Sequence, residues 1–275
     1  MDTPLRVGAV SYLNAKPLYH RLIDFAPGVE LVLDVPSHLA VRLSSGNLDV
    51  ALIPSVEYLW GAASGYEILP GFAIAARGPV RSVKLFSRVS FEKIHRLALD
   101  EGSRTSRALA RVWLDAKYGI RPDRLESLPL GVPPQESTAD AVLVIGDRAM
   151  RVPDGDFLEV VDLAEVWRDL TGLPFVFALW VARPGVDLGD LPEALRRCRE
   201  AGLAEADQIA AQAGPGLGLN VATCYDYLTN VLSYDLGEPE LAGLRRFAAM
   251  AAAMGLAPEG AKLVFHRRRD LATRC

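Results

Sequence analysis

The order of short apolar segments along the chain is the feature that most limits its fold. Residues 6–10, 30–35 and 49–54 are runs of apolar or β-branched side chains, which are typical of buried strands. Residues 16–25 and 38–44 lie between these runs and have helical character, with Ser37 placed to cap the second helix. Strands that alternate with helices in this way predict a mainly parallel sheet covered by helices on both faces.

The same alternation returns in the middle of the chain. Residues 97–99 predict a strand that leads into a helix ending at Gly119. Beyond this point the expected strands are 141–145, 158–161 and 175–182, and the expected helices are 163–170, 191–213, 221–232 and 238–254. A second α/β unit followed by a helical return is therefore predicted.

The length of the chain fits two lobes, because 275 residues exceed a typical single domain and fall short of two large ones. We predict one lobe from residues 1–84 plus 182–275 and a second from residues 85–181. Strands near 83–87 and 175–181 would cross between them. This order fits an α/β, two-lobed, periplasmic-binding-protein-like (type II) fold with mainly parallel sheets and a cleft between the lobes.

Charge and hydropathy exclude several classes of partner. The formal net charge of -4 gives no broad positive field, so nucleic acid is not expected as a partner. The most apolar late stretch, residues 247–256, is too short to span a membrane and predicts a core helix. The first residues lack the basic and long apolar regions of an export signal, so we expect a cytoplasmic protein.

Cysteines and cofactor motifs give no sign of a metal or redox centre. Cys198, Cys224 and Cys275 lie far apart, without the spacing of a zinc site or a disulfide framework. The sequence has no His-Glu-x-x-His motif, no phosphate loop and no Gly-x-Ser-x-Gly elbow. We therefore expect no metal and no flavin, nicotinamide or other cofactor.

Three polar segments follow predicted strands and are candidates for a binding site. Ligands of open α/β sheets bind beyond the carboxyl ends of strands, where loops converge and helices present free amides. The candidate segments are residues 11–14 with Ser11 and Asn14, Ser55 after the strand at 49–54, and residues 102–106 after the strand at 97–99.

The segment at residues 102–106 is the most informative of these. Gly102 allows a close approach of the backbone, and Ser103, Thr105 and Ser106 supply hydroxyls at a helix start that carries partial positive charge. These groups suit a carboxylate or a phosphate, although Ser103 or Thr105 could equally serve only to cap the helix. Arg104 could pair with a ligand or with a surface acid.

Other candidates each have two interpretations. Asn14 could orient a ligand hydroxyl or hold its own turn. Ser82 would face the cleft if the strand register is favourable, and Asp147, which follows Gly146, is either a helix cap or a cleft acid. The aromatic residues that could line a slot for a ring, or belong to the core, are Tyr12, Phe175 and Trp180.

Motifs along nearly the whole chain resemble those of chorismate dehydratases of the futalosine route to menaquinone. They occur in the expected order at residues 7–19, 49–58, 102–106, 144–149, 167–178 and 234–237. Lys16 and Ser55 depart from the pattern of the family, which leaves their roles open.

The resemblance implies elimination of water from chorismate to give 3-[(1-carboxyvinyl)oxy]benzoate, a hydro-lyase reaction without a cofactor. It assigns Asn14 a catalytic role in the cleft, where it would orient the leaving hydroxyl or the enolpyruvyl group. The implied substrate-binding residues are Ser11, Ser55, Ser82, Ser103, Arg104, Thr105, Ser106, Gly146 and Asp147.

The implied chemistry uses the substrate itself. The ring proton beside the enol ether is vinylogous to the ring carboxylate, so binding that carboxylate at a helix start favours movement of charge onto it. No histidine follows these strands, so the side-chain carboxylate of the substrate is expected to accept the proton.

Two rival functions share the fold: 1,4-dihydroxy-6-naphthoate synthase, and a non-catalytic protein that binds an anionic solute.

Overall fold

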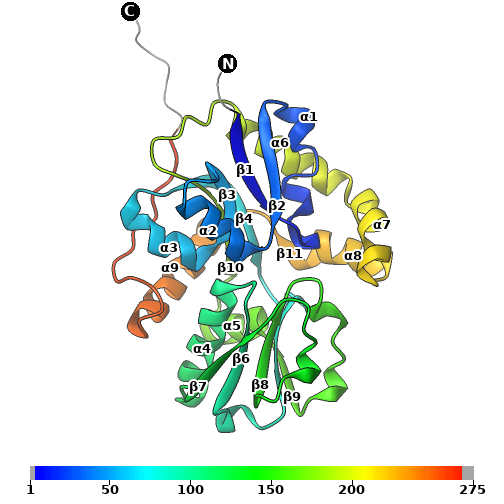
Figure 1. The fold of residues 1–275 in the computed structure, drawn as a ribbon, viewed down its shortest axis with the longest axis vertical. Coiled ribbons are helices and arrows are strands. Elements are labelled where there is room, and N and C mark those ends of the chain that lie inside the picture. The colour runs from blue at the N-terminus through cyan, green and yellow to red at the C-terminus, as the bar shows by residue number, and fades with distance from the viewer. Residues whose placement is uncertain (1–3, 268–275) are drawn as a thin grey trace, which may run out of the picture.

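The structure, a computed structural model, describes residues 4–267; residues 1–3 and 268–275, which include Cys275, lie outside the described part. The chain forms two lobes, each built on its own sheet and drawn one above the other in Figure 1. Both ends of the described chain belong to the upper lobe, whereas the green middle of the chain forms the lower lobe.

The first lobe contains a six-stranded sheet in the order β11-β4-β10-β3-β1-β2. Its strands are β1 (Leu5–Val10), β2 (Val29–Asp34), β3 (Val50–Pro54), β4 (Glu67–Ala76), β10 (Phe175–Ala182) and β11 (Leu232–Ser233). Its helices are α1 (Leu22–Phe25), α2 (Pro36–Ser44), α3 (Ser55–Gly61), α6 (Leu191–Ala204), α7 (Ala206–Leu217), α8 (Val221–Asp226) and α9 (Glu238–Ala253), with a 3-10 helix η1 at Leu13–Leu18.

The second lobe contains a five-stranded sheet in the order β7-β6-β8-β5-β9. Its strands are β5 (Val83–Ser87), β6 (Arg96–Asp100), β7 (Arg124–Leu128), β8 (Ala141–Ile145) and β9 (Glu159–Asp162). Its helices are α4 (Arg104–Tyr118) and α5 (Leu163–Thr171). Gly119 ends α4 with a φ of 69°, as expected for a glycine that follows a helix in the left-handed conformation.

Both sheets are mixed, so the prediction of mainly parallel sheets was wrong. β1 pairs in parallel with β2 and β3, and β6 pairs in parallel with β7 and β8. β10 runs antiparallel to β3 and β4, and β5 runs antiparallel to β8 and β9. The reason is geometric: β5 and β10 each begin where the chain enters from the other lobe, whereas their neighbours β3, β4, β8 and β9 end on the side where the lobes meet.

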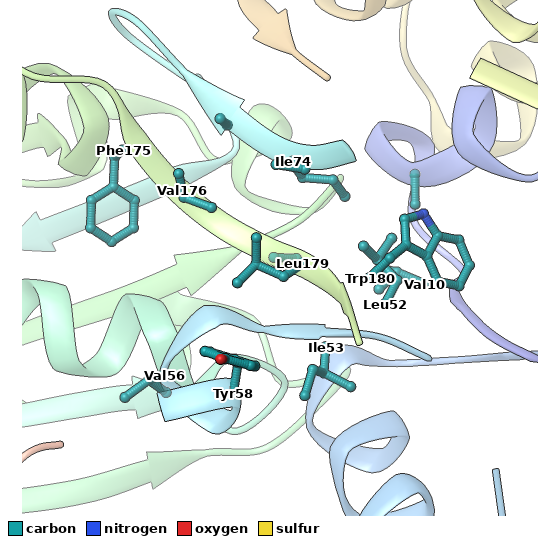
Figure 2. Close-up of a cluster of buried hydrophobic side chains, with 14 of the residues drawn as sticks. Val10, Leu52, Ile53, Val56, Tyr58, Ile74, Phe175, Val176, Leu179 and Trp180 are labelled. Atoms are coloured by element: carbon teal, nitrogen blue, oxygen red, sulfur yellow. The ribbon is translucent and has the colours of Figure 1, made fainter. Parts of the chain in front are cut away.

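β10 is a central strand of the first lobe and organises its core. All of its residues except Phe177 are buried, and they pack with side chains of β3, α3 and β4. Figure 2 shows Leu179 of this strand near Ile53 and Tyr58, and Trp180 beside Val10 and Leu52. Burial of such side chains is the main source of stability in a lobe of this size.

The sheet to which each strand belongs indicates where the chain passes between the lobes. We expected β10 to lie in the second lobe, but it pairs with β3 and β4 in the first sheet, while the whole of β5 lies in the second sheet. We therefore propose that the crossings are the segments 77–82 and 172–174, which join β4 to β5 and α5 to β10.

One expected helix cap was wrong. α2 begins at Pro36, after an extended Val35, and no side chain caps it. Proline at the first helical position has a suitable φ and needs no amide partner, so Ser37 is not required as a cap. The Ser37 amide instead donates to the Gly102 carbonyl oxygen of the second lobe at 3.3 Å.

Within residues 4–267, no helix is long and apolar enough to cross a membrane. The same residues contain no cluster of three or more His, Cys, Asp or Glu side chains that could hold a metal ion. Cys198 and Cys224 are buried free thiols.

Candidate functional site

A crevice lies where the two lobes meet. It contains about 510 Å³ of empty space, a volume that includes open solvent at its mouth. Its lining residues are Val10, Tyr12, Asn14, Pro36, Pro54, Ile74, Val80, Ser82, Val83, Ser103, Ser106, Ile145, Gly146, Phe177 and Ala178. The walls are mostly apolar, with a few hydroxyl and amide groups contributed by both lobes.

The polar lining residues come from loops that follow strands. Asn14 lies in η1 after β1, Ser103 and Ser106 follow β6, and Gly146 follows β8. Ser82 lies just before β5, in the segment that leaves the first lobe. The structure therefore brings together at one crevice five residues from four segments that are far apart in sequence.

The start of α4 forms one polar wall of the crevice. Ser103 is the N-cap, and its Oγ accepts a hydrogen bond from the Ser106 amide at 3.1 Å. Both serines are at least nine-tenths buried and line the crevice, so Ser103 caps the helix and also faces the site. The other amides of this first turn lack partners within the helix and carry its partial positive charge.

Asp100 holds the two turns of the second lobe in place. Its carboxylate is 1% exposed, accepts from the Gly102 amide at 2.9 Å and from the Ile145 amide at 3.0 Å, and pairs with Arg148 Nη2 at 2.6 Å. One buried side chain thereby ties the turn before α4 to the turn after β8.

Tyr12 of the first lobe packs against both of these turns. A methyl group placed on Gly146 would lie 3.0 Å from Tyr12 Cε2, and one placed on Gly102 would lie 3.0 Å from the Tyr12 hydroxyl oxygen. Gly146 also has a φ of 70°, which side chains disfavour. Both the backbone conformation and the tyrosine ring thus favour glycine at position 146. Burial raises the pKa of Tyr12, so its hydroxyl stays protonated.

Asn14 has an unpaired acceptor. Its Oδ1 atom is buried and has no hydrogen-bond partner among the described residues. A buried acceptor left unpaired costs about 1–3 kcal/mol, so this oxygen favours a ligand that can donate a hydrogen bond. Ser82, which is 1% exposed, accepts a hydrogen bond from the Tyr227 hydroxyl at 2.7 Å.

Ser55 and Thr105 are buried together where the lobes touch, outside the crevice lining. Thr105 Oγ1 accepts from the Val56 amide at 3.1 Å and lies 3.4 Å from Ser55 Oγ. Ser55 Oγ donates to the Val176 carbonyl oxygen at 2.8 Å. These two hydroxyls join α3 of the first lobe to α4 of the second.

Two charged candidates also connect the lobes. Arg104 pairs with Glu57 of α3 at 2.9 Å. Asp147 accepts from the Leu13 amide at 3.2 Å and so caps η1 from the opposite lobe. Burial raises the pKa of Asp147, although the Leu13 amide and the charge of Lys16 act in the opposite direction. Ser11 is exposed, does not line the crevice and donates its amide to the Asp34 carbonyl oxygen.

Comparison with known proteins identifies the family. A profile described as "Menaquinone biosynthesis" matches residues 5–253. The chain belongs to the menaquinone biosynthesis family. This finding, together with a relative from Thermus thermophilus named chorismate dehydratase, confirms the resemblance seen in the sequence motifs. That relative is 35% identical over 263 residues, which cover 89% of this chain and 94% of the relative.

Solved structures confirm the binding-protein-like fold of this menaquinone biosynthesis family member. The alkanesulfonate-binding protein SsuA from Xanthomonas axonopodis pv. citri superimposes with a TM-score of 0.67 at 18% identity, over 96% of each chain. The Candida albicans CA3427 gene product, described as having the generic periplasmic binding protein fold, gives 0.68 at 10% identity, over 98% of this chain and 99% of its own.

Several lining residues of this menaquinone biosynthesis family member were not among the candidates. Phe177 lines the crevice, whereas Phe175 packs with Trp167 and Phe247 in the core. Trp180 is fully buried and does not line the crevice. Phe175 and Phe177 share a face, as alternation along β10 predicts, and their ring centroids lie 4.7 Å apart, but only Phe177 lines the crevice.

Proposed function

We propose that this protein is a chorismate dehydratase that removes water from chorismate to give 3-[(1-carboxyvinyl)oxy]benzoate. The family relationship over most of the chain is the main support for this proposal. The crevice supports it as well, because Asn14 and the start of α4 both line it. The reaction is a hydro-lyase step of menaquinone biosynthesis by the futalosine route. We place it in the cytoplasm, without a cofactor.

Neutral groups are proposed to bind the two carboxylates of the substrate. Among the described residues that line the crevice, none is a lysine, arginine or histidine. The ring carboxylate would lie against the Ser103 and Ser106 hydroxyls and the free amides of α4, where the helix terminus favours an anion. Tyr12 and Phe177 supply apolar surface for the ring.

The elimination then proceeds with the charge already stabilised. The carbon that bears the enol ether loses its proton, and the electron pair moves through the ring double bond onto the bound carboxylate. Return of these electrons forms the aromatic ring and breaks the bond to the neighbouring hydroxyl, so the proton and hydroxide leave as one water molecule.

The enolpyruvyl carboxylate of the substrate is the proposed proton acceptor. The described lining of the crevice contains no carboxylate or imidazole side chain that could take this role. Asn14 is proposed to hold the leaving hydroxyl, since its unpaired Oδ1 requires a donor.

The remaining candidates are proposed to act on closure and shape. Ser55, Thr105, Arg104 and Asp147 make contacts between the lobes and would hold the crevice closed around the substrate. Gly146 gives space to Tyr12, whereas Ser11, being exposed outside the lining, has no contact that supports direct binding.

Incubation of the purified protein with chorismate tests the proposal. Formation of 3-[(1-carboxyvinyl)oxy]benzoate, followed by mass spectrometry and ultraviolet absorbance, is the expected result, and Asn14→Ala should retain binding but lose most turnover. Binding of chorismate without turnover would favour a solute-binding protein. Neither binding nor turnover of chorismate would leave the naphthoate synthase as the better assignment.

A further inference from the structure

Tyr227 lies directly behind the crevice although it does not line it. Its side chain is 0% exposed, and it begins a π-helical turn, Tyr227–Val231, that follows α8. π-helical turns are rare and occur frequently at functional sites. The residue comes from the helical return of the chain, far in sequence from every candidate discussed above.

The Tyr227 hydroxyl connects two lining residues from different segments. It donates to Ser82 Oγ at 2.7 Å in a fully buried contact. The Asn14 side chain also reaches the Tyr227 hydroxyl, because η1, which contains Asn14, packs against the π-helical turn. Burial raises the pKa of Tyr227 above its ordinary value, so the phenol keeps its proton.

The number of available protons determines the orientation of the Asn14 amide. A phenol has one proton, and here it is directed to Ser82. The Asn14 group that meets the Tyr227 oxygen must therefore be the donor, which is the Nδ2 amide nitrogen. This leaves Oδ1 as the free end, in agreement with its lack of any partner among the described residues.

We propose that Tyr227 is a positioning residue, whose hydroxyl holds the Ser82 hydroxyl and turns the Asn14 amide so that Oδ1 faces the substrate. The inference rests on the proposed function. The two carboxyl groups of chorismate are ionised at neutral pH, so its ring hydroxyl is its one O–H donor. Asn14 Oδ1 then accepts from the hydroxyl that departs, and Tyr227 keeps that acceptor in place.

The test is a kinetic comparison of Tyr227→Phe with the wild-type protein. This variant keeps the ring and removes only the hydroxyl. Loss of the fixed amide should lower kcat by about 10- to 100-fold, because small errors of placement are costly in catalysis. The KM for chorismate should change little, since the start of α4 is untouched.

Tyr234→Phe is the matched control. Tyr234 is also buried, and its hydroxyl has no partner among the described residues, so removal of that hydroxyl should leave kcat and KM unchanged. Thermal unfolding of both variants separates a loss of turnover from a loss of folding.

A double-mutant cycle distinguishes positioning from general structural damage. If Tyr227 acts through Asn14, adding Tyr227→Phe to Asn14→Ala should cause little further loss of kcat. Should Tyr227→Phe fail to fold, Ser82→Ala breaks the same hydrogen-bond chain and is expected to show the same lack of additivity.

The outcomes separate this inference from the function on which it rests. Full kcat in Tyr227→Phe, or losses that multiply in the double variant, would overturn the positioning role while wild-type turnover of chorismate supports the enzyme assignment. No turnover by the wild-type protein would overturn the proposed function and the inference with it.

Discussion

Replacement of Asp100 by asparagine should destabilise the second lobe because four hydrogen bonds converge on this carboxylate. Asparagine has nearly the same shape and could still accept from the Gly102 amide. Its NH₂ group, however, would meet the Ile145 amide and the Arg148 guanidinium, which are both donors. The substitution therefore leaves a buried amide and a largely buried cation without their acceptor.

Loss of one partner from a buried ion pair costs about 3–5 kcal/mol. Arg148 is 20% exposed and also donates to the Pro129 and Val132 carbonyl oxygens, so we expect about 3 kcal/mol, near the lower limit. For a chain of this size the midpoint of thermal unfolding should fall by about 6–12 °C.

Thermal unfolding followed by circular dichroism measures this shift. Glu200→Gln is the control, because Glu200 belongs to an exposed pair with Arg196 and its loss should leave the midpoint essentially unchanged. A midpoint for Asp100→Asn equal to that of the control would show that Asp100 does not anchor the two turns.

Two further substitutions test the geometry of the crevice. Gly146→Ala should raise the KM for chorismate in steady-state kinetics, because the added methyl group meets Tyr12. Gly119→Ala is the control: it has a similar φ of 69° and no neighbour within 4 Å, so it should lose a comparable stability of about 1–2 kcal/mol without a change in KM. A KM for Gly146→Ala equal to that of Gly119→Ala would show that the contact with Tyr12 does not affect substrate binding. Asp147→Asn should raise the unfolding midpoint at pH 7, because burial raises the pKa of this carboxyl and its ionisation therefore opposes folding at every pH above that raised value. The gain should disappear as the pH falls below the ordinary value of 3.8, and an asparagine variant that is less stable at pH 7 would contradict it.

Much of the fold could be predicted from sequence where hydrophobic periodicity is strong and boundaries are marked. The strand at 175–182 and the end of α4 at Gly119 match the structure, because an unbroken apolar run and a left-handed glycine are local signals. β4 was not predicted, since Pro70 and Gly71 in its middle indicate a turn. In the structure both residues are exposed where the pairing of β4 with β10 shifts register, so the strand continues past them.

The site was only partly predictable for a similar reason. Asn14, Ser103, Ser106 and Gly146 follow strands, so a rule about strand ends could identify them. Tyr227 follows no strand and reaches the crevice only through a hydrogen bond across 145 residues of sequence. Local pattern carries no information about such a contact.

A further group of candidates turned out to lie between the lobes rather than in the lining. Ser55 begins α3 directly after β3, and Thr105 lies in the first turn of α4 after β6, so both follow strands that end near the crevice. Their hydroxyls meet each other because α3 and α4 pack end to end across the two lobes. Distinguishing a residue that lines a cleft from one that closes it requires the relative placement of the lobes, which sequence spacing does not contain.

A crystal structure of the Asn14→Ala variant with chorismate bound would test the central claim most directly. We expect the ring carboxylate against Ser103 and Ser106 at the start of α4, with the ring hydroxyl directed at the space left by the missing amide. Chorismate bound outside the crevice, or bound within it with the ring carboxylate directed away from α4, would rule out this binding mode.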